Sequence, residues 1–252
     1  GMARDDLNAV LKAHGLIFAP DPATSSRANV GGMIGNNSSG TKSILYGKTV
    51  DHVLELKTVL SNGSICTFSE VNPSEFEKKC QLENREGTIY RNFKRLINQN
   101  KTAIEAAFPK VMRRVQGYNL DEFIHTDQWN LAKLICGSEG TLAVTLEAKL
   151  NLELLPTHKS VCVVHFGEVL EAIQAVETML EFQPSAVEIL DKTVVDLSRQ
   201  NLTTKRSCHF IEGNPAAIQI VEFYGQSPED VLERPKKMVA KLKALGFGYA
   251  YP

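Results

Sequence analysis

The stretch from Phe18 to Gly47 constrains the fold most, because thirty consecutive residues in it follow neither a helical nor a strand period. It is rich in Gly, Asn and Ser, and it reads FAPDPATSSRANVGGMIGNNSSGTKSILYG. A stretch of this length without regular structure, inside a compact domain, is usually either a binding segment or disordered. The apolar residues Val30, Met33 and Ile34 argue against disorder. The pattern therefore predicts an ordered segment that binds a ligand.

Regular elements are predicted on both sides of this stretch. They are a helix over 5–16, a β-hairpin over 53–70, mostly helical chain over 73–107 and a strand over 141–152. Asn62-Gly63 marks the hairpin turn, because Asn-Gly is a preferred pair in two-residue hairpin loops. Glu86-Gly87 marks the expected break in the helical chain. We expect the hairpin and the later strand to share one sheet.

The pattern of apolar and polar residues changes at Pro156. Beyond it we expect strands over 160–166, 185–190 and 217–224, helices over 168–181, 191–199 and 227–245, and the start of another strand at Gly248. Strands that alternate with helices in so short a block are typical of a small ferredoxin-like α+β domain. The predicted fold class is therefore α+β, with one domain over 1–155 and a second over 156–252.

Composition excludes several classes of protein. Hydrophobic residues make up 43% and charged residues 23% of the chain, as in an ordinary globular protein. The net charge of -1 gives no case for binding nucleic acid or an anionic membrane. No apolar run is long enough for a membrane span, and nothing resembles a signal peptide. The five cysteines are odd in number and lack C-x-x-C spacing, so they indicate no disulfide framework or metal site. Thiols scattered in apolar surroundings suggest a reducing, cytoplasmic location.

Two glycine-rich segments are the best candidates for a binding site. The first runs from Gly31 to Gly40, and the second is Gly137-Ser138-Glu139-Gly140-Thr141. Glycine lets a backbone approach a ligand closely, and successive N–H groups can form an anion-binding nest. The Asn and Ser side chains add neutral donors that suit a pyrophosphate or the carbonyls of a flavin ring. Glycine chemistry alone equally allows tight structural turns. Neither segment has the spacing of a Rossmann fingerprint or a P-loop.

Three motifs in order resemble one known family. PDPATSSRANVGGMIGNNSSGTKSILYGKTVDHV, VMRRVQGYNLDEF and GSEGTLAVTLEAKL are similar to successive motifs of the vanillyl-alcohol-oxidase/PCMH flavoprotein superfamily, in particular its FAD-linked oxidases and dehydrogenases of 2-hydroxy acids. The later segments SAVEILDK and IQIVEFYG resemble the start of the family's cap domain. The resemblance implies part of a PCMH-type FAD-binding domain, followed by part of a ferredoxin-like cap domain, with FAD as the cofactor.

The resemblance also implies which residues contact FAD. Carried over by position, they are Asp21, Pro22, Thr24, Gly32, Gly35, Asn36, Asn37, Ser38, Ser39, Glu139, Gly140, Thr141, Leu142 and Val144. Members of the family often have Gly and Ile where this chain has Ala143 and Val144, a change that leaves backbone contacts in place.

Two parts of the family pattern are missing. No Arg/Gly-rich phosphate loop precedes Asp21, and none of the six histidines stands in the family's metal-binding or catalytic contexts. We therefore expect a fragment that binds FAD weakly and is inactive by itself, with the catalytic residues outside the chain and no metal site within it.

The function implied by the resemblance is oxidation of a small 2-hydroxy acid, such as D-lactate or glycolate, by hydride transfer to the flavin. An iron–sulfur module or another electron acceptor, and self-association, are implied as partners. One alternative is a non-catalytic remnant or accessory protein, which the missing motifs favour for this chain taken alone. Another is a nucleotide-binding or UDP-sugar-binding reductase of the same superfamily.

Other candidate residues have plainer interpretations beside the functional ones. His52 follows Asp51, and a local surface hydrogen bond is favoured over catalysis there. Arg113 and Arg114 could bind a substrate carboxylate or make surface ion pairs. Glu188 and Asp191 could offer metal ligands, but no histidine stands near them in the sequence, so a structural role is favoured.

Overall fold

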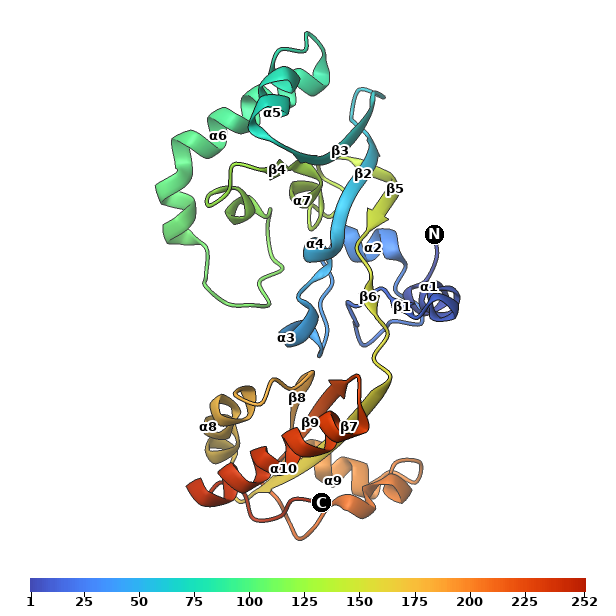
Figure 1. Ribbon diagram of the computed structural model, residues 1–252, viewed down its shortest axis with the longest axis vertical. Helices are drawn as coiled ribbons and strands as arrows, with labels where there is room; N and C mark the ends of the chain where they lie inside the picture. Colours follow the sequence, from blue (N-terminus) through green and yellow to red (C-terminus); the bar gives the residue numbers. More distant parts are fainter. The chain divides into compact units, whose positions relative to one another are not determined.

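The computed structural model describes residues 1–252, and the chain divides into two compact units, Gly1–Leu154 and Leu155–Pro252 (Figure 1). Each unit combines helices with antiparallel sheet, which confirms the predicted α+β class. No helix has the length and hydropathy that a membrane span requires.

The first unit is built on a four-stranded antiparallel sheet in the order β4-β3-β2-β5. The strands are β2 (Val53–Val59), β3 (Ile65–Val71), β4 (Trp129–Asn130) and β5 (Val144–Leu150). β2 and β3 form the predicted hairpin, and Gly63 in its turn has a φ of 83°, which few other residues tolerate. β5 pairs with β2, so the prediction that the hairpin and the later strand share one sheet is confirmed.

Helices and aromatic rings complete the core of this unit. The helices are α5 (Pro73–Cys80), α6 (Arg85–Ala107) and α7 (Leu131–Ile135), with the short 3-10 helix η2 (Leu120–Phe123) before α7. Trp129 contacts the edges or faces of three Phe rings at centroid distances of 4.8 Å (Phe76), 5.6 Å (Phe93) and 5.9 Å (Phe123). The rings thus join α5, α6 and η2 to the end of the sheet.

The helical break predicted at Glu86-Gly87 is wrong by a few residues. The chain leaves the helix after Cys80, and both predicted break residues lie in the first turn of α6. The Asn84 side chain accepts a hydrogen bond from Gly87 N at 3.0 Å and so starts α6. A Cβ on Gly87 would lie 2.0 Å from Leu82 O, so this glycine serves a close approach of the backbone.

The aperiodic stretch contains short helices. It holds α2 (Val30–Gly35) and α3 (Ser43–Tyr46), and α4 (Thr49–His52) comes directly after it. Before it lie α1 (Arg4–Leu11), η1 (Lys12–His14) and β1 (Leu16–Ile17), which pairs with β6 (Glu153–Leu154). No helix was predicted at α2, because glycine disfavours a helix. Burial of Met33 and Ile34 in this turn of helix overrides that propensity.

The second unit has three strands arranged as in a ferredoxin-like fold. Its elements are β7 (His158–Phe166), α8 (Val169–Leu180), β8 (Ala186–Asp191), α9 (Lys192–Gln200), η3 (Lys205–Phe210), β9 (Ala217–Gly225) and α10 (Pro228–Leu245). The sheet order is β7-β9-β8, and all pairs are antiparallel. Beyond α10, His165 N donates to Ala250 O at 2.9 Å, so the final residues run along β7. This order agrees with the predicted ferredoxin-like arrangement.

Candidate cofactor site

The two glycine-rich segments meet, although about a hundred residues separate them in the sequence. Gly137 N donates to Ile34 O at 2.8 Å, and Glu139 N donates to Gly35 O at 2.8 Å. The two candidate segments therefore lie together in one place, as parts of a single binding site must. Gly137 has a φ of 83°, and a Cβ there would lie 3.2 Å from Asn37 Cβ, so only glycine suits this junction.

A third segment, from Arg114 to Asn119, is fixed beside this junction. The Arg114 side chain is buried and donates to Asp121 Oδ1 at 2.5 Å, to Asn119 Oδ1 at 3.2 Å and to Gln116 O at 3.2 Å. Asn119 Nδ2 in turn donates to Cys136 O at 2.7 Å. Of the two roles considered from the sequence, Arg114 thus takes the ion pair, with the partly exposed Asp121, and its fork holds its own loop in place.

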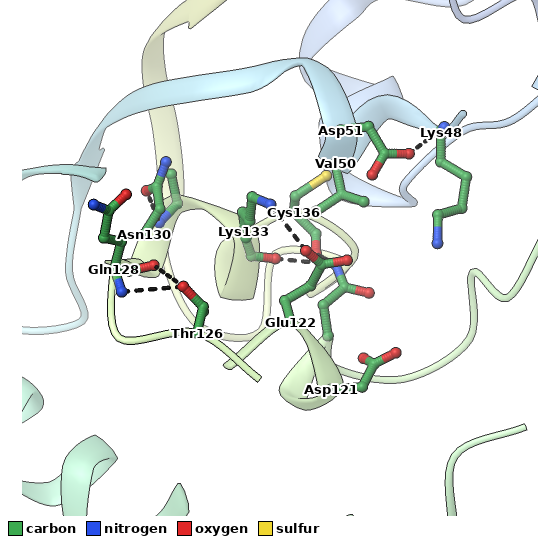
Figure 2. A network of polar contacts seen from close by, with 12 residues as sticks. Lys48, Val50, Asp51, Asp121, Glu122, Thr126, Gln128, Asn130, Lys133 and Cys136 are labelled. Atoms are coloured by element: carbon green, nitrogen blue, oxygen red, sulfur yellow. Dashed lines mark hydrogen bonds and ion pairs between the residues drawn. The ribbon is translucent and has the colours of Figure 1, made fainter. Parts of the chain in front are cut away.

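A salt bridge and a further hydrogen bond connect α7 to the chain at and just after this third segment. Lys133 on α7 donates to Glu122 at 2.9 Å (Figure 2). Lys133 O also accepts from Asn119 Nδ2 at 3.0 Å. The third segment is therefore tied to α7 at several points, and α7 leads directly into the second glycine-rich segment.

These three segments enclose an open cavity of 530 Å³. Its lining residues are Asn36, Asn37, Ser38, Ser39, Val115, Gln116, Gly117, Gly137 and Glu139. Glu139 is the only charged residue in that lining. The other polar side chains are amides and hydroxyls, which can donate to and accept from a neutral polar ligand.

Asn37 is the most informative residue of the cavity. It is fully buried, and its Oδ1 accepts from Val50 N at 2.9 Å and contacts Cys136 Sγ at 3.7 Å. Its Nδ2 is buried and has no partner. Its φ of 50° is in the left-handed region, which Asn tolerates better than most residues. Because its side chain is fully buried and bonded to Val50 N, Asn37 fixes the loop that carries the accessible side chains of its neighbours.

Two titratable residues near the cavity have structural roles. Burial, followed by the carboxylate of Asp51, raises the pKa of the Cys136 thiol to about 12, so this thiol is neutral and not a nucleophile. His52 is buried, and its Nε2 lies 2.7 Å from Tyr46 O. The surface hydrogen bond expected for His52 is thus wrong in its location, because the ring packs against Phe18 inside the unit.

Asp21 holds the first glycine-rich segment and does not line the cavity. Its carboxylate pairs with Lys42 Nζ at 2.9 Å and accepts from Lys42 N at 3.1 Å and Thr41 Oγ1 at 3.2 Å. A Cβ on Gly40 would lie 2.1 Å from Asp21 O, so the glycine allows the two backbones to touch. Asp21 therefore fixes the backbone of the first glycine-rich segment through contacts that lie outside the cavity lining.

The structure brings only some of the predicted contact residues to the cavity. Those that line it are Asn36, Asn37, Ser38, Ser39 and Glu139. Those that do not are Asp21, Pro22, Thr24, Gly32, Gly35, Gly140, Thr141, Leu142 and Val144. Thr141 Oγ1 bonds Tyr118 OH at 2.8 Å, and Leu142 lines a separate apolar pocket.

Sequence reasoning assigned no role to Val115, Gln116 and Gly117, which form one wall of the cavity. The motif RRVQGYNLDE contained them, but nothing in its composition marked a ligand contact.

In the second unit, Asp191 accepts from Val194 N at 2.9 Å and caps α9. No group of three or more His, Cys, Asp or Glu side chains in the chain could hold a metal ion.

Fold and site together define a flavoprotein of the FAD-linked oxidase class. Residues 1–69 match the family described as FAD binding domain, and residues 155–250 match the family described as FAD linked oxidases, C-terminal domain. The chain belongs to the FAD-linked oxidases, as its motifs indicated, and FAD is the cofactor of that family.

Curated relatives agree with this placement. The chain is 33% identical over 97% of its length to a D-2-hydroxyglutarate dehydrogenase of Pseudomonas putida and 32% identical over 97% to the one of Escherichia coli. It is 31% identical over 75% of its length to a mitochondrial D-lactate dehydrogenase of Arabidopsis thaliana. The chain spans only 25% of the length of each of these relatives.

Solved structures share the fold at low sequence identity. An alkyldihydroxyacetonephosphate synthase matches all of this chain with a TM-score of 0.63 at 19% identity, over 38% of its own length. A p-cresol methylhydroxylase matches all of the chain with a TM-score of 0.56 at 12% identity, over 44% of its length. These likenesses support the PCMH-type fold.

Proposed function

We propose that the chain is the part of an FAD-dependent dehydrogenase for a small 2-hydroxy acid in which the 530 Å³ cavity receives FAD. The observation that carries this proposal is the convergence of the two glycine-rich segments and the Val115–Gly117 segment on one cavity. Accessible amide and hydroxyl side chains in that lining can meet a ligand with carbonyl or hydroxyl groups.

The donors of the cavity fit the neutral parts of FAD. Asn36, Ser38 and Ser39 offer an amide and hydroxyls that suit the carbonyls of the flavin ring or the hydroxyls of its ribityl chain. No Lys or Arg lines the cavity, and the Glu139 carboxylate would repel a phosphate. We therefore assign the pyrophosphate to a place outside this lining. Contacts of FAD with the remaining predicted residues stay predictions.

In the proposed reaction, bound FAD supplies the hydride acceptor. The chain's own contribution is to bind and orient it: Asn37 is fixed by Val50 and Cys136, and the opposite wall is fixed by Arg114. Such a rigid cradle favours one orientation of the ligand. The Cys136 thiol, with its raised pKa, takes no part in proton transfer.

The substrate proposal rests on the relatives. Those named D-2-hydroxyglutarate dehydrogenase, D-lactate dehydrogenase and glycolate oxidase act on acids that share a carboxylate and a neighbouring hydroxyl. We propose an acid of this class for the protein to which the chain belongs. An iron–sulfur module or another electron acceptor, self-association and a cytoplasmic location also stay predictions.

Titration with FAD tests the cofactor site. Quenching of flavin fluorescence should saturate with the native chain, and Asn36→Asp should weaken the affinity about tenfold or more, because the substitution removes an accessible donor from the lining and adds a negative charge there. Asn62→Asp, in the exposed hairpin turn, is the matched control and should leave the affinity unchanged. Equal affinities for all three proteins would exclude Asn36 from the FAD site.

Anaerobic reduction tests the substrate class. D-2-hydroxyglutarate, D-lactate or glycolate should bleach the visible absorbance of the FAD-loaded full-length protein to which the chain belongs, whereas glutarate, propionate and acetate, which lack the hydroxyl, should not. Bleaching by none of the hydroxy acids would favour the alternative of a protein that keeps the fold without the chemistry.

A further inference from the structure

A second hollow of the first unit lies apart from the residues that line the cofactor cavity. It is an apolar pocket of 190 Å³ between β3, α6 and α7. Its floor is formed by the buried side chains of Phe68, Leu131 and Ile135, and its rim includes the exposed residues Ser61 and Arg85. The pocket therefore combines an apolar interior with a polar, positively charged mouth.

The size of the pocket decides what its interior can hold. An engineered protein cavity of about 150 Å³ lined by Leu, Ile and Phe stays dry and takes up benzene. The pocket here has 190 Å³ and a similar lining. It can therefore take one ring or a short branched chain, whereas a long acyl chain does not fit.

Arg85 sets the charge of the ligand. On the same helix, Arg91 donates to Cys80 O at 2.5 Å and Lys94 pairs with Glu77, whereas the Arg85 guanidinium has no partner in the chain. Its planar fork suits a carboxylate, to which it can donate two parallel hydrogen bonds.

We propose that this pocket binds a small carboxylic acid, with an apolar ring or short branched chain inserted between β3, α6 and α7 and its carboxylate on Arg85. The site differs from the cofactor cavity, with which it shares no lining residue. The two are nevertheless close in sequence, since Glu139 lines the cavity and Leu142 and Ala143 line the pocket. The proposal does not depend on binding of FAD.

Three probes separate the contribution of the ligand's apolar group to binding from that of its carboxylate. 3-Phenylpropionate should bind saturably at millimolar concentration and shift the methyl NMR signals of Leu134 and Ile135, which line the pocket. The uncharged 3-phenylpropanol should bind about tenfold more weakly, because it lacks the ion pair with Arg85. Acetate, which lacks the apolar body, should not bind. Failure of 3-phenylpropionate to bind, or shifts confined to methyl groups elsewhere, would overturn the proposal.

Variants test the residues. Arg85→Gln should reduce the affinity for 3-phenylpropionate to that for 3-phenylpropanol, and Lys101→Gln, which removes a charge from an exposed position of the same helix, should leave it unchanged. Ala143→Leu should fill the pocket and abolish binding of both ligands. Ile89→Phe narrows the pocket from α6 and replaces Ala143→Leu if that variant does not fold. Unchanged affinity in Arg85→Gln, or in a folded filling variant, contradicts the proposed site.

Discussion

At the scale of single residues, Arg114 shows how a side chain away from the ligand can shape a binding cavity. It does not line the cavity, but three acceptors hold its guanidinium, and one of them is the carbonyl of Gln116 in the cavity wall. Asn119, whose Oδ1 accepts one of these hydrogen bonds, in turn donates from Nδ2 to Cys136 O. The position of the wall thus depends on the geometry of one fork of donors.

Arg114→Lys should therefore damage both stability and binding. Lysine keeps the charge but cannot reach Asp121, Asn119 and Gln116 together, so the free energy of unfolding should fall by about 1–3 kcal/mol, with weaker binding of FAD. Urea unfolding and FAD titration measure the two effects. Arg113→Lys, at the exposed neighbouring position, should change neither; equal effects of the two substitutions would exclude the role given to Arg114.

His165 should make the stability depend on pH. It is buried, its Nε2 accepts from Glu212 N at 3.2 Å, and its Nδ1 has no partner. Burial lowers its pKa from the usual 6.5; the backbone of Ala250 and the carboxylate of Glu212 oppose this shift, whereas Arg199 adds to it. The unfolded chain therefore binds the proton more readily, and stability should fall as the pH drops below 6.5.

Thermal unfolding between pH 8 and pH 5 measures this dependence. His165→Gln retains an acceptor for Glu212 N without a titrating ring, so its melting temperature should fall less at acidic pH than that of the native chain. His14→Gln, at an exposed position, should retain the native pH dependence. A native-like acid loss in His165→Gln would assign the effect to other groups.

At the scale of elements, sequence patterns predicted those helices and strands whose formation depends on residues close together in the sequence. The Asn62-Gly63 turn and the alternation around it gave the hairpin, and the predicted strand and helix ranges after Pro156 agree with the structure to within two residues. The helix α2 and the wall Val115–Gly117 were not predictable, because contacts distant in sequence determine them: burial of Ile34 and the hydrogen bonds of Arg114.

The first glycine-rich segment, Gly31 to Gly40, offers a matched pair of glycine substitutions. Gly40→Ala places a Cβ 2.1 Å from Asp21 O, so it should cost about 1–3 kcal/mol and weaken FAD binding by displacing Ser38 and Ser39. Gly31→Ala, in α2 with no heavy atom within 4 Å of the new Cβ, should instead stabilise the chain by about 0.5–1 kcal/mol. Denaturant unfolding compares the two, and a harmless Gly40→Ala would contradict the proposed close packing.

At the scale of the whole molecule, the two units have separate hydrophobic cores. One cluster gathers residues of the first unit around Leu56 and Tyr90, and the other gathers residues of the second unit around Val221 and Leu242. No sheet contains strands of both units. We propose that the first unit is the cofactor-binding part and the second the start of the substrate-side cap, as the resemblance implies.

Separate cores predict separate unfolding. Leu242→Ala removes a fully buried side chain of α10 and should lower the stability of the second unit by about 2–5 kcal/mol, while Leu56→Ala, in β2, should do the same to the first unit. Calorimetry of the native chain should show two transitions, and each substitution should lower the temperature of only one. FAD should raise only the transition that Leu56→Ala lowers, because a ligand stabilises the unit that binds it. A single transition that both substitutions shift equally would show that the two units unfold as one cooperative body.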